Sequence, residues 1–129
     1  MARWTAPEIL DYETSQATES KQADVYAFGM VAVEAFTGKV PFHEKFVVDA
    51  MNCILEGKVP RNHGDKPLTD EMWNFLERCW EKDPQKRPVI EKVVEEWQKF
   101  PADTTMEDGG PQLPLTAESN MVSKVLLLF

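Results

Sequence analysis

The sequence has little that would let the chain cross a membrane or bind a polyanion. Its longest uninterrupted apolar run covers residues 125–129, whereas roughly 20 residues are needed to span a bilayer. The first twenty residues contain no apolar segment of the secretory-signal type. Lys and Arg number 14 against 22 Asp and Glu, a net charge of -8, whereas nucleic-acid binding needs a basic surface. We therefore expect a cytoplasmic chain with no membrane span and no nucleic-acid partner.

Cysteine and histidine are also scarce. Cys53 and Cys79 lie in segments with apolar helical patterns and lack the paired spacing of a zinc site, and His43 and His63 lie in expected loops away from both cysteines. We expect no metal site, and two reduced, buried thiols of the kind found in cytosolic proteins.

The chain of 129 residues, 43% of them hydrophobic, suits one domain with a modest core. Apolar residues recur at helical spacing over about residues 21–36, 44–56, 69–82 and 88–100. No segment alternates in the manner of a strand, so we expect an all-α fold of four main helices. Thr69 is expected to cap the third helix, and Pro88 to be the first residue of the fourth.

The helix expected over residues 21–36 is apolar on all sides, with Glu34 nearly alone as an interior charge, which is typical of a buried helix. Gly38 is expected to end it. The composition changes at about residue 101, and residues 101–129 are expected to form a flexible acidic and polar tail with a short apolar end. Residues 122–129 could dock on the body of the protein, bind a partner or have no role, and the sequence leaves these alternatives open.

Three segments, in this order, carry a family resemblance. They are Arg-Trp-Thr-Ala-Pro-Glu at residues 3–8, Asp-Val-Tyr-Ala-Phe-Gly at 24–29, and the run that contains Cys-Trp at 79–80, Asp-Pro at 83–84 and Arg-Pro at 87–88. They resemble the end of the activation segment, the start of the central helix and the last two helices of the C-terminal lobe of a protein kinase. The kinases that these segments resemble are of the tyrosine-kinase or tyrosine-kinase-like type. The resemblance covers about residues 2–100, so residues 1–100 are expected to be a partial kinase domain.

The resemblance assigns structural roles to several residues. It implies a buried ion pair between Glu8, which follows Pro7 in the Ala-Pro-Glu motif, and Arg87, whose planar fork suits a carboxylate. Asp24 would accept hydrogen bonds from the catalytic loop of the intact family. Gly29, which is costly inside a helix, is expected to allow another segment to pack closely.

The resemblance also implies a substrate-positioning role for three residues near the start of the chain, and the tryptophans are expected to lie in the core. Trp4, Thr5 and Ala6 would correspond to the surface that receives the substrate residue just after the phosphorylated one. Trp80 is expected to be a core anchor, as are the tryptophans at 73 and 97.

The groups that perform phosphoryl transfer are absent from the sequence. There is no glycine-rich G-x-G-x-x-G loop, no V-A-I-K-like strand, no H-R-D and no D-F-G. The resemblance implies ATP and magnesium only for the intact kinase, and no residue here is a candidate for catalysis, cofactor binding or metal binding. We expect that this chain alone does not transfer phosphate.

Two functions remain open at this point. The chain could be part of a catalytically competent kinase that phosphorylates protein Ser, Thr or Tyr, with its upstream sequence missing. Alternatively, it could be a non-catalytic protein-interaction module derived from a kinase C-lobe. A third interpretation, a generic helical bundle, would account for the four helical patterns but not for the three motifs in their order. Because the helix over residues 21–36 would lack its upstream cover, we expect some of its side chains to face water, with marginal stability, self-association through the exposed surface, or dependence on a partner that covers it.

Overall fold

The computed structural model describes residues 2–11, 20–62 and 68–100, and every regular element within them is helical. The predicted tail, residues 101–129, and His63 lie outside these ranges. The α-helices are α1 (Pro7–Leu10), α2 (Lys21–Thr37), α3 (Val47–Leu55), α4 (Asp70–Cys79) and α5 (Ile90–Trp97), with short 3₁₀ turns η1 (Ala2–Trp4) and η2 (Pro84–Lys86). The all-α prediction is therefore confirmed for the described residues.

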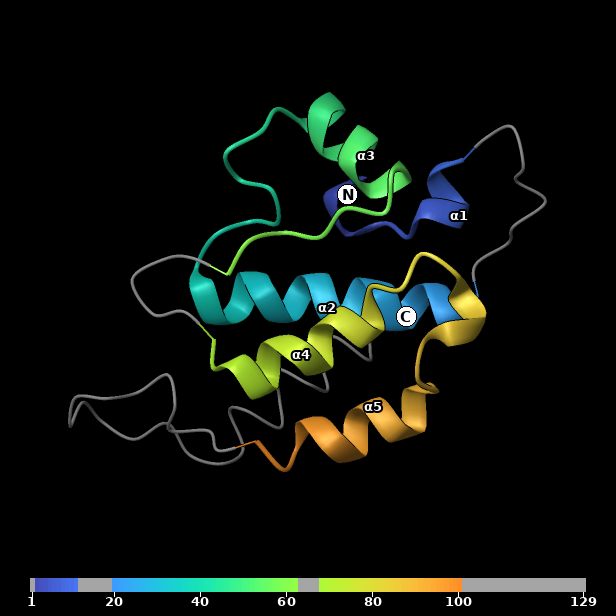
Figure 1. Ribbon diagram of the computed structural model, residues 1–129, viewed down its shortest axis with the longest axis vertical. Helices are drawn as coiled ribbons and strands as arrows, with labels where there is room; N and C mark the ends of the chain where they lie inside the picture. Colours follow the sequence, from blue (N-terminus) through green and yellow to red (C-terminus); the bar gives the residue numbers. More distant parts are fainter. Residues whose placement is uncertain (1, 12–19, 63–67, 101–129) are drawn as a thin grey trace.

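Helix α2 is the centre of the arrangement. Figure 1 shows it crossing the middle of the molecule, with α1 and α3 on one side and α4 and α5 on the other. The Ser20 hydroxyl caps its first turn by accepting a hydrogen bond from the Ala23 amide at 3.1 Å. Gly38, with φ of 75°, ends it in the left-handed conformation that glycine adopts without steric cost.

The side chains of α2 are more completely covered than the sequence led us to expect. Val25, Tyr26, Phe28 and Met30 are each no more than 2% exposed. The large apolar side chains that do face water lie elsewhere, chiefly at the start of α3. The expectation of an exposed central helix is therefore wrong for these residues, since contacts on opposite sides of the helix bury them.

Helix α3 begins at Val47 rather than near Glu44. The Lys45 amide bonds to the Phe42 carbonyl over 2.9 Å, so the residues before the helix form a separate turn. Phe46 is the extended residue at the N-cap position. Gly57, with φ of 80°, follows the helix in the left-handed conformation that glycine adopts readily.

The last two α-helices, α4 and α5, pack on α2, and their first residues are set by the residues just before them. Thr69 caps α4, as predicted, by accepting from the Met72 amide at 3.3 Å. Helix α5 begins at Ile90 rather than Pro88, because Arg87 and Val89 both have extended backbone. The pre-proline position disfavours the α conformation at Arg87, but it is the extended Val89 that takes the N-cap position and makes the helix begin at Ile90.

Trp97 of α5 joins the helices into one core. Its ring meets those of Phe28 and Phe36 edge-on, with centroids 5.6 and 5.4 Å apart. Phe75 of α4 and Phe100 pack on the same indole at 5.9 and 5.5 Å. Offset and edge-on pairs of this kind add stability beyond the burial of their area. Trp97 is thus the core anchor that its helical position predicted.

Both cysteines are free thiols buried in this core, as predicted. Burial raises the pKa of the Cys79 thiol to about 12, and the Glu96 carboxylate adds to the rise while Arg78 and Arg87 oppose it. No helix in the described part of the chain is long and apolar enough to cross a bilayer.

Candidate functional site

The ion pair between Arg87 and Glu8 is the first feature of the candidate site. Arg87 Nη1 donates to Glu8 Oε2 over 2.8 Å, and Nη2 donates to Oε1 over 2.9 Å. The Arg87 side chain is fully buried, whereas that of Glu8 is 20% exposed. The ion pair implied by the resemblance is therefore present, in the parallel two-bond geometry that a guanidinium and a carboxylate favour.

The remaining donors of Arg87 bind three backbone carbonyls from two other places in the chain. Nε donates to Glu81 O over 2.8 Å, Nη1 to Gln22 O over 2.9 Å and Nη2 to Lys82 O over 3.4 Å. A guanidinium has five N–H groups, and all five of Arg87 are used. This side chain therefore fastens α1, the start of α2 and the α4–η2 connection to one point.

Tyr26 forms the floor beneath this guanidinium. The Arg87 carbon Cζ lies 5.0 Å from the centre of the Tyr26 ring, within the range of a cation–π contact. Burial raises the pKa of the Tyr26 phenol well above its usual value, with Arg87 opposing the rise and Glu8 adding to it. The phenol therefore stays neutral at physiological pH, and the charge at this junction is balanced between Arg87 and Glu8.

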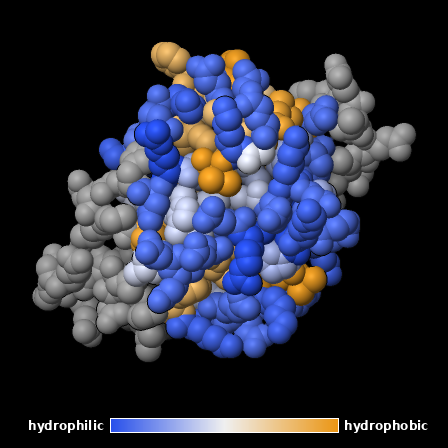
Figure 2. Space-filling view, viewed as in Figure 1, coloured by the Kyte–Doolittle hydropathy of each residue, from blue (hydrophilic) through white to orange (hydrophobic). Residues whose placement is uncertain are grey.

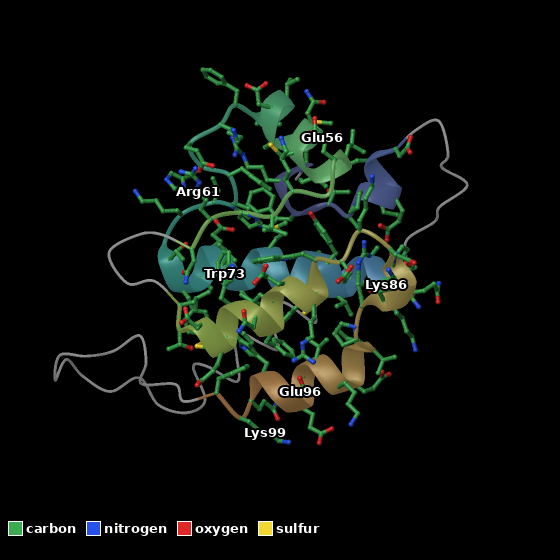
Figure 3. The ribbon with its side chains drawn as sticks, in the orientation of Figure 1. Glu56, Arg61, Trp73, Lys86, Glu96 and Lys99 are labelled. Atoms are coloured by element: carbon green, nitrogen blue, oxygen red, sulfur yellow. The ribbon has the colours of Figure 1, made fainter. Side chains whose placement is uncertain are left out.

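Gly29 and Trp80 are in direct contact, which accounts for the glycine inside α2. A Cβ atom built on Gly29 would lie 2.4 Å from Trp80 Nε1 and 3.0 Å from Cδ1, so no side chain fits there. Trp80 is buried and meets Trp73 edge-on at 5.2 Å, and Figure 3 shows Trp73 between α4 and α2. The indole N–H of Trp80 has no hydrogen-bond partner within the described structure.

Arg3 anchors the first residues of the chain to the loop between α2 and α3. Its Nη1 donates to the carbonyls of Pro41 and Phe42 over 3.0 and 2.6 Å, and its Nη2 donates to that of Lys45 over 2.6 Å. Phe42 has a φ of 55°, an uncommon value for a residue with a side chain. Arg3 therefore holds an otherwise unfavourable loop, a role that the sequence did not reveal.

Trp4 makes a second unforeseen contact. Its indole Nε1 donates to Glu34 Oε1 over 3.0 Å. Glu34 is nearly the only charge inside an apolar helix, and this pattern could have predicted that its carboxylate has a hydrogen-bond donor as a partner. Thr5 is half-buried, and Ala6 is 1% exposed and occupies the N-cap position of α1 without a side-chain hydrogen bond, directly before Pro7 in the first turn. The segment 3–8 is thus fixed to α2, to the α2–α3 loop and to Arg87.

Asp24 lies in the first turn of α2, where a negative charge complements the helix dipole, and it is half-buried. In the residues that the structure describes, no three His, Cys, Asp or Glu side chains are grouped so as to hold a metal ion. The described residues thus offer no fit for magnesium, and we assign none of them to ATP or to a metal. What the arrangement can do is hold residues 3–8, from the end of η1 to the start of α1, rigidly against a helical body.

Comparisons with known proteins agree with this geometry. The profile of the family described as "Protein tyrosine and serine/threonine kinase" matches residues 1–97. A light-sensor protein kinase of Ceratodon purpureus is 37% identical over 105 residues, covering 72% of this chain and 8% of its own length. The proto-oncogene tyrosine-protein kinase ROS of Homo sapiens is 30% identical over 102 residues, which are 76% of this chain and 4% of that protein. The serine/threonine/tyrosine-protein kinase HT1 of Arabidopsis thaliana is 29% identical over 119 residues, or 92% of this chain and 28% of its own.

An all-helical body that binds an Ala-Pro-Glu segment through a buried arginine defines the class, the C-terminal lobe of a protein kinase. The chain belongs to the protein tyrosine and serine/threonine kinase family. It spans 8% or less of the length of the three relatives that match it first, the Ceratodon purpureus kinase and two putative serine/threonine-protein kinase/receptors of Acanthamoeba polyphaga mimivirus.

Proposed function

We propose that this chain is the C-terminal part of the C-lobe of a cytoplasmic protein kinase that, as a whole, transfers phosphate from ATP to Ser, Thr or Tyr of protein substrates. The observation that carries this proposal is the junction at Arg87, which fixes residues 3–8 in place by using all five of its N–H donors. In a kinase, this junction would keep the end of the activation segment in a fixed position. Such fixing supports the proposal because phosphoryl transfer depends on positioning and electrostatics.

Within that kinase, Trp4, Thr5 and Ala6 would form part of the surface that receives the substrate residue after the phosphorylated one. Their rigid anchoring supports this role, since the segment is bound on one side by Arg3 and Trp4 and on the other by Glu8. Free buried thiols support a reducing, cytoplasmic environment.

We further propose that this chain alone does not bind ATP or transfer phosphate. Titration of the chain with magnesium-ATP in a calorimeter tests this statement, and we expect no saturable heat. Saturable binding would refute it. The kinase proposal itself is tested on the transcript: in-frame codons for H-R-D and D-F-G upstream of Met1 are expected.

A second candidate is a non-catalytic interaction module derived from a kinase C-lobe. The exposed apolar side chains at the start of α3 favour it, because they form a surface for which the described residues provide no cover. A transcript that begins at Met1, together with a folded monomeric product, would support this candidate and contradict the first.

A further inference from the structure

Three of the five exposed large apolar side chains of the described residues are consecutive in the chain. Phe46 is 83% exposed, Val47 49% and Val48 67%, and they lie where α3 begins. Figure 2 shows apolar atoms at the upper edge of the molecule, where Figure 1 places α3. A single exposed apolar residue needs no explanation, but a contiguous group of three is typical of an interaction site.

A hollow with basic side chains adjoins this apolar group. Lys39, His43 and Arg61 are among the residues that line it, and no Asp or Glu is. Figure 3 shows Arg61 beside the loop that joins α2 to α3. His43 pairs with Glu44, Nδ1 to Oε2 over 3.5 Å, which leaves Lys39 and Arg61 as the principal charges of the hollow. We call the hollow and residues 46–48 together the α3 surface.

Arg3 brings the two parts of this surface together. Pro41 and Phe42 line the hollow, and Lys45 directly precedes Phe46. The carbonyls of all three accept hydrogen bonds from the one Arg3 guanidinium, so one side chain holds both the backbone that lines the hollow and the residue before Phe46. The loop that carries them is fixed before any partner arrives, which lowers the entropic cost of binding.

The charge balance of this region indicates the chemistry of the partner. Residues 38–62 contain four Lys or Arg and three Asp or Glu, whereas the rest of the chain contains ten and 19. Glu56 is paired with Lys58 over 2.9 Å, so Lys39, Lys45 and Arg61 remain against Glu44 and Asp49. A local excess of positive charge in an acidic protein favours a partner with carboxylates, through both steering and specificity.

We propose that the α3 surface binds an extended acidic segment of a partner protein, with an aliphatic or aromatic side chain of that segment on Phe46 and Val48 and a carboxylate at Lys39 and Arg61. This inference rests on the second candidate function, whose partner it specifies. A second copy of this chain would bring the same basic hollow against itself, which like charges disfavour. Residues 122–129 carry Lys124 and no acidic side chain, so the α-carboxylate of Phe129 is the one negative charge that they could offer to the hollow.

The test is fluorescence anisotropy of a labelled peptide of about twelve residues in which Leu and Phe alternate with Asp and Glu, mixed with the full chain. We expect saturable binding that weakens as salt is added. A peptide with Lys in place of the acids, or with Ser in place of Leu and Phe, should bind at least about 10-fold more weakly, or about 1.4 kcal/mol. Equal binding of the three peptides would overturn the proposal.

Two variants with matched controls locate the site. Phe46→Ser and Arg61→Glu should each weaken binding about 5- to 10-fold. Val89→Ser, at a side chain 59% exposed before α5, and Lys86→Glu on η2 should leave it unchanged. Figure 3 shows Lys86 on η2, away from Arg61. Equal losses in variants and controls would show that the peptide binds elsewhere.

Two further outcomes would assign the surface to other occupants. If light scattering shows a dimer that Phe46→Ser converts to a monomer, a second copy occupies it. If the full chain with Leu126, Leu127 and Leu128 replaced by Ser gains peptide binding, the chain's own terminal segment occupies it. Either result overturns the proposal, and neither affects the kinase proposal, because the assay contains no nucleotide.

Discussion

Arg87 and Glu8 are 79 positions apart in the sequence and are joined by two parallel hydrogen bonds of 2.8 and 2.9 Å. The arginine side chain is fully buried, and its other N–H groups reach the carbonyls of Gln22, Glu81 and Lys82. A buried charge with every donor satisfied is tolerated because its desolvation is offset by these contacts. The same charge with one partner removed is not.

Removal of Glu8 or Arg87 should therefore destabilise the chain strongly. We expect Glu8→Ala and Arg87→Met to lower the free energy of unfolding by about 3–5 kcal/mol, measured by urea denaturation. The control is Arg78→Met, which breaks an exposed pair with Glu96 and should cost at most about 1 kcal/mol. Equal losses at Arg78 and Arg87 would contradict the structural role given to the buried pair.

Substitution of Gly29 by alanine should destabilise the chain although alanine favours a helix. The new Cβ would lie 2.4 Å from Trp80 Nε1, so the buried indole must shift. We expect a net loss of about 1–3 kcal/mol in the free energy of unfolding. In a Trp80→Phe background the clash is relieved, and the same change should be neutral or stabilising by up to about 1 kcal/mol. An unchanged cost in the double variant would exclude the indole as its cause.

The Trp4–Glu34 hydrogen bond should contribute measurably to stability. Trp4→Phe keeps an aromatic ring but removes the N–H donor to the Glu34 carboxylate. We expect a loss of about 1.5–3 kcal/mol, typical of hydrogen bonds to charged groups. In the Trp4→Phe background the hydrogen bond is already broken. There, Glu34→Ala should lower the free energy of unfolding by no more than about 0.5 kcal/mol beyond what the loss of the Glu34 side chain costs without that bond. Full additivity of the two changes, measured in a double-mutant cycle, would argue against the bond.

The stability of the chain should fall as the pH rises above about 9. The Cys79 thiol has an ordinary pKa of 9.0 and one of about 12 in the folded chain, chiefly because of burial. Between these values the unfolded chain loses a proton that the folded chain keeps, so unfolding is favoured as the pH rises, by up to about 1.4 kcal/mol per pH unit. Tyr26, whose pKa burial also raises, acts in the same direction at higher pH.

Urea denaturation at a series of pH values measures this effect. The Cys79→Ala variant provides the comparison, because it is expected to lose stability at every pH but to show a shallower slope between pH values of about 9 and 11. The thiol should also react slowly with an alkylating agent at about pH 8 while the chain is folded. Rapid alkylation of Cys79 in the native chain would contradict its burial.

Local signals in the sequence predicted the helices well where capping and periodicity agreed. The end of α2 at Gly38 and the cap of α4 at Thr69 follow from residues next to them. The start of α3 was predicted too early, because the carbonyls of the residues before it are bound by Arg3, which is distant in sequence. The start of α5 was also placed too early, at Pro88, whereas the extended backbone of Arg87 and Val89 delays it.

The sequence by itself determined the family and the all-α class, because ordered motifs and helical periodicity need no coordinates, and the family resemblance implied the ion pair of Glu8 with Arg87. Only the tertiary structure decided that Arg87 also binds three carbonyls, that Trp4 reaches Glu34, and that Phe46 faces water while the central helix is covered. Carbonyls have no sequence signature, and burial depends on which segments the chain brings together. The residues thus specify local structure and chemical type, and the long-range contacts specify which of those groups meet.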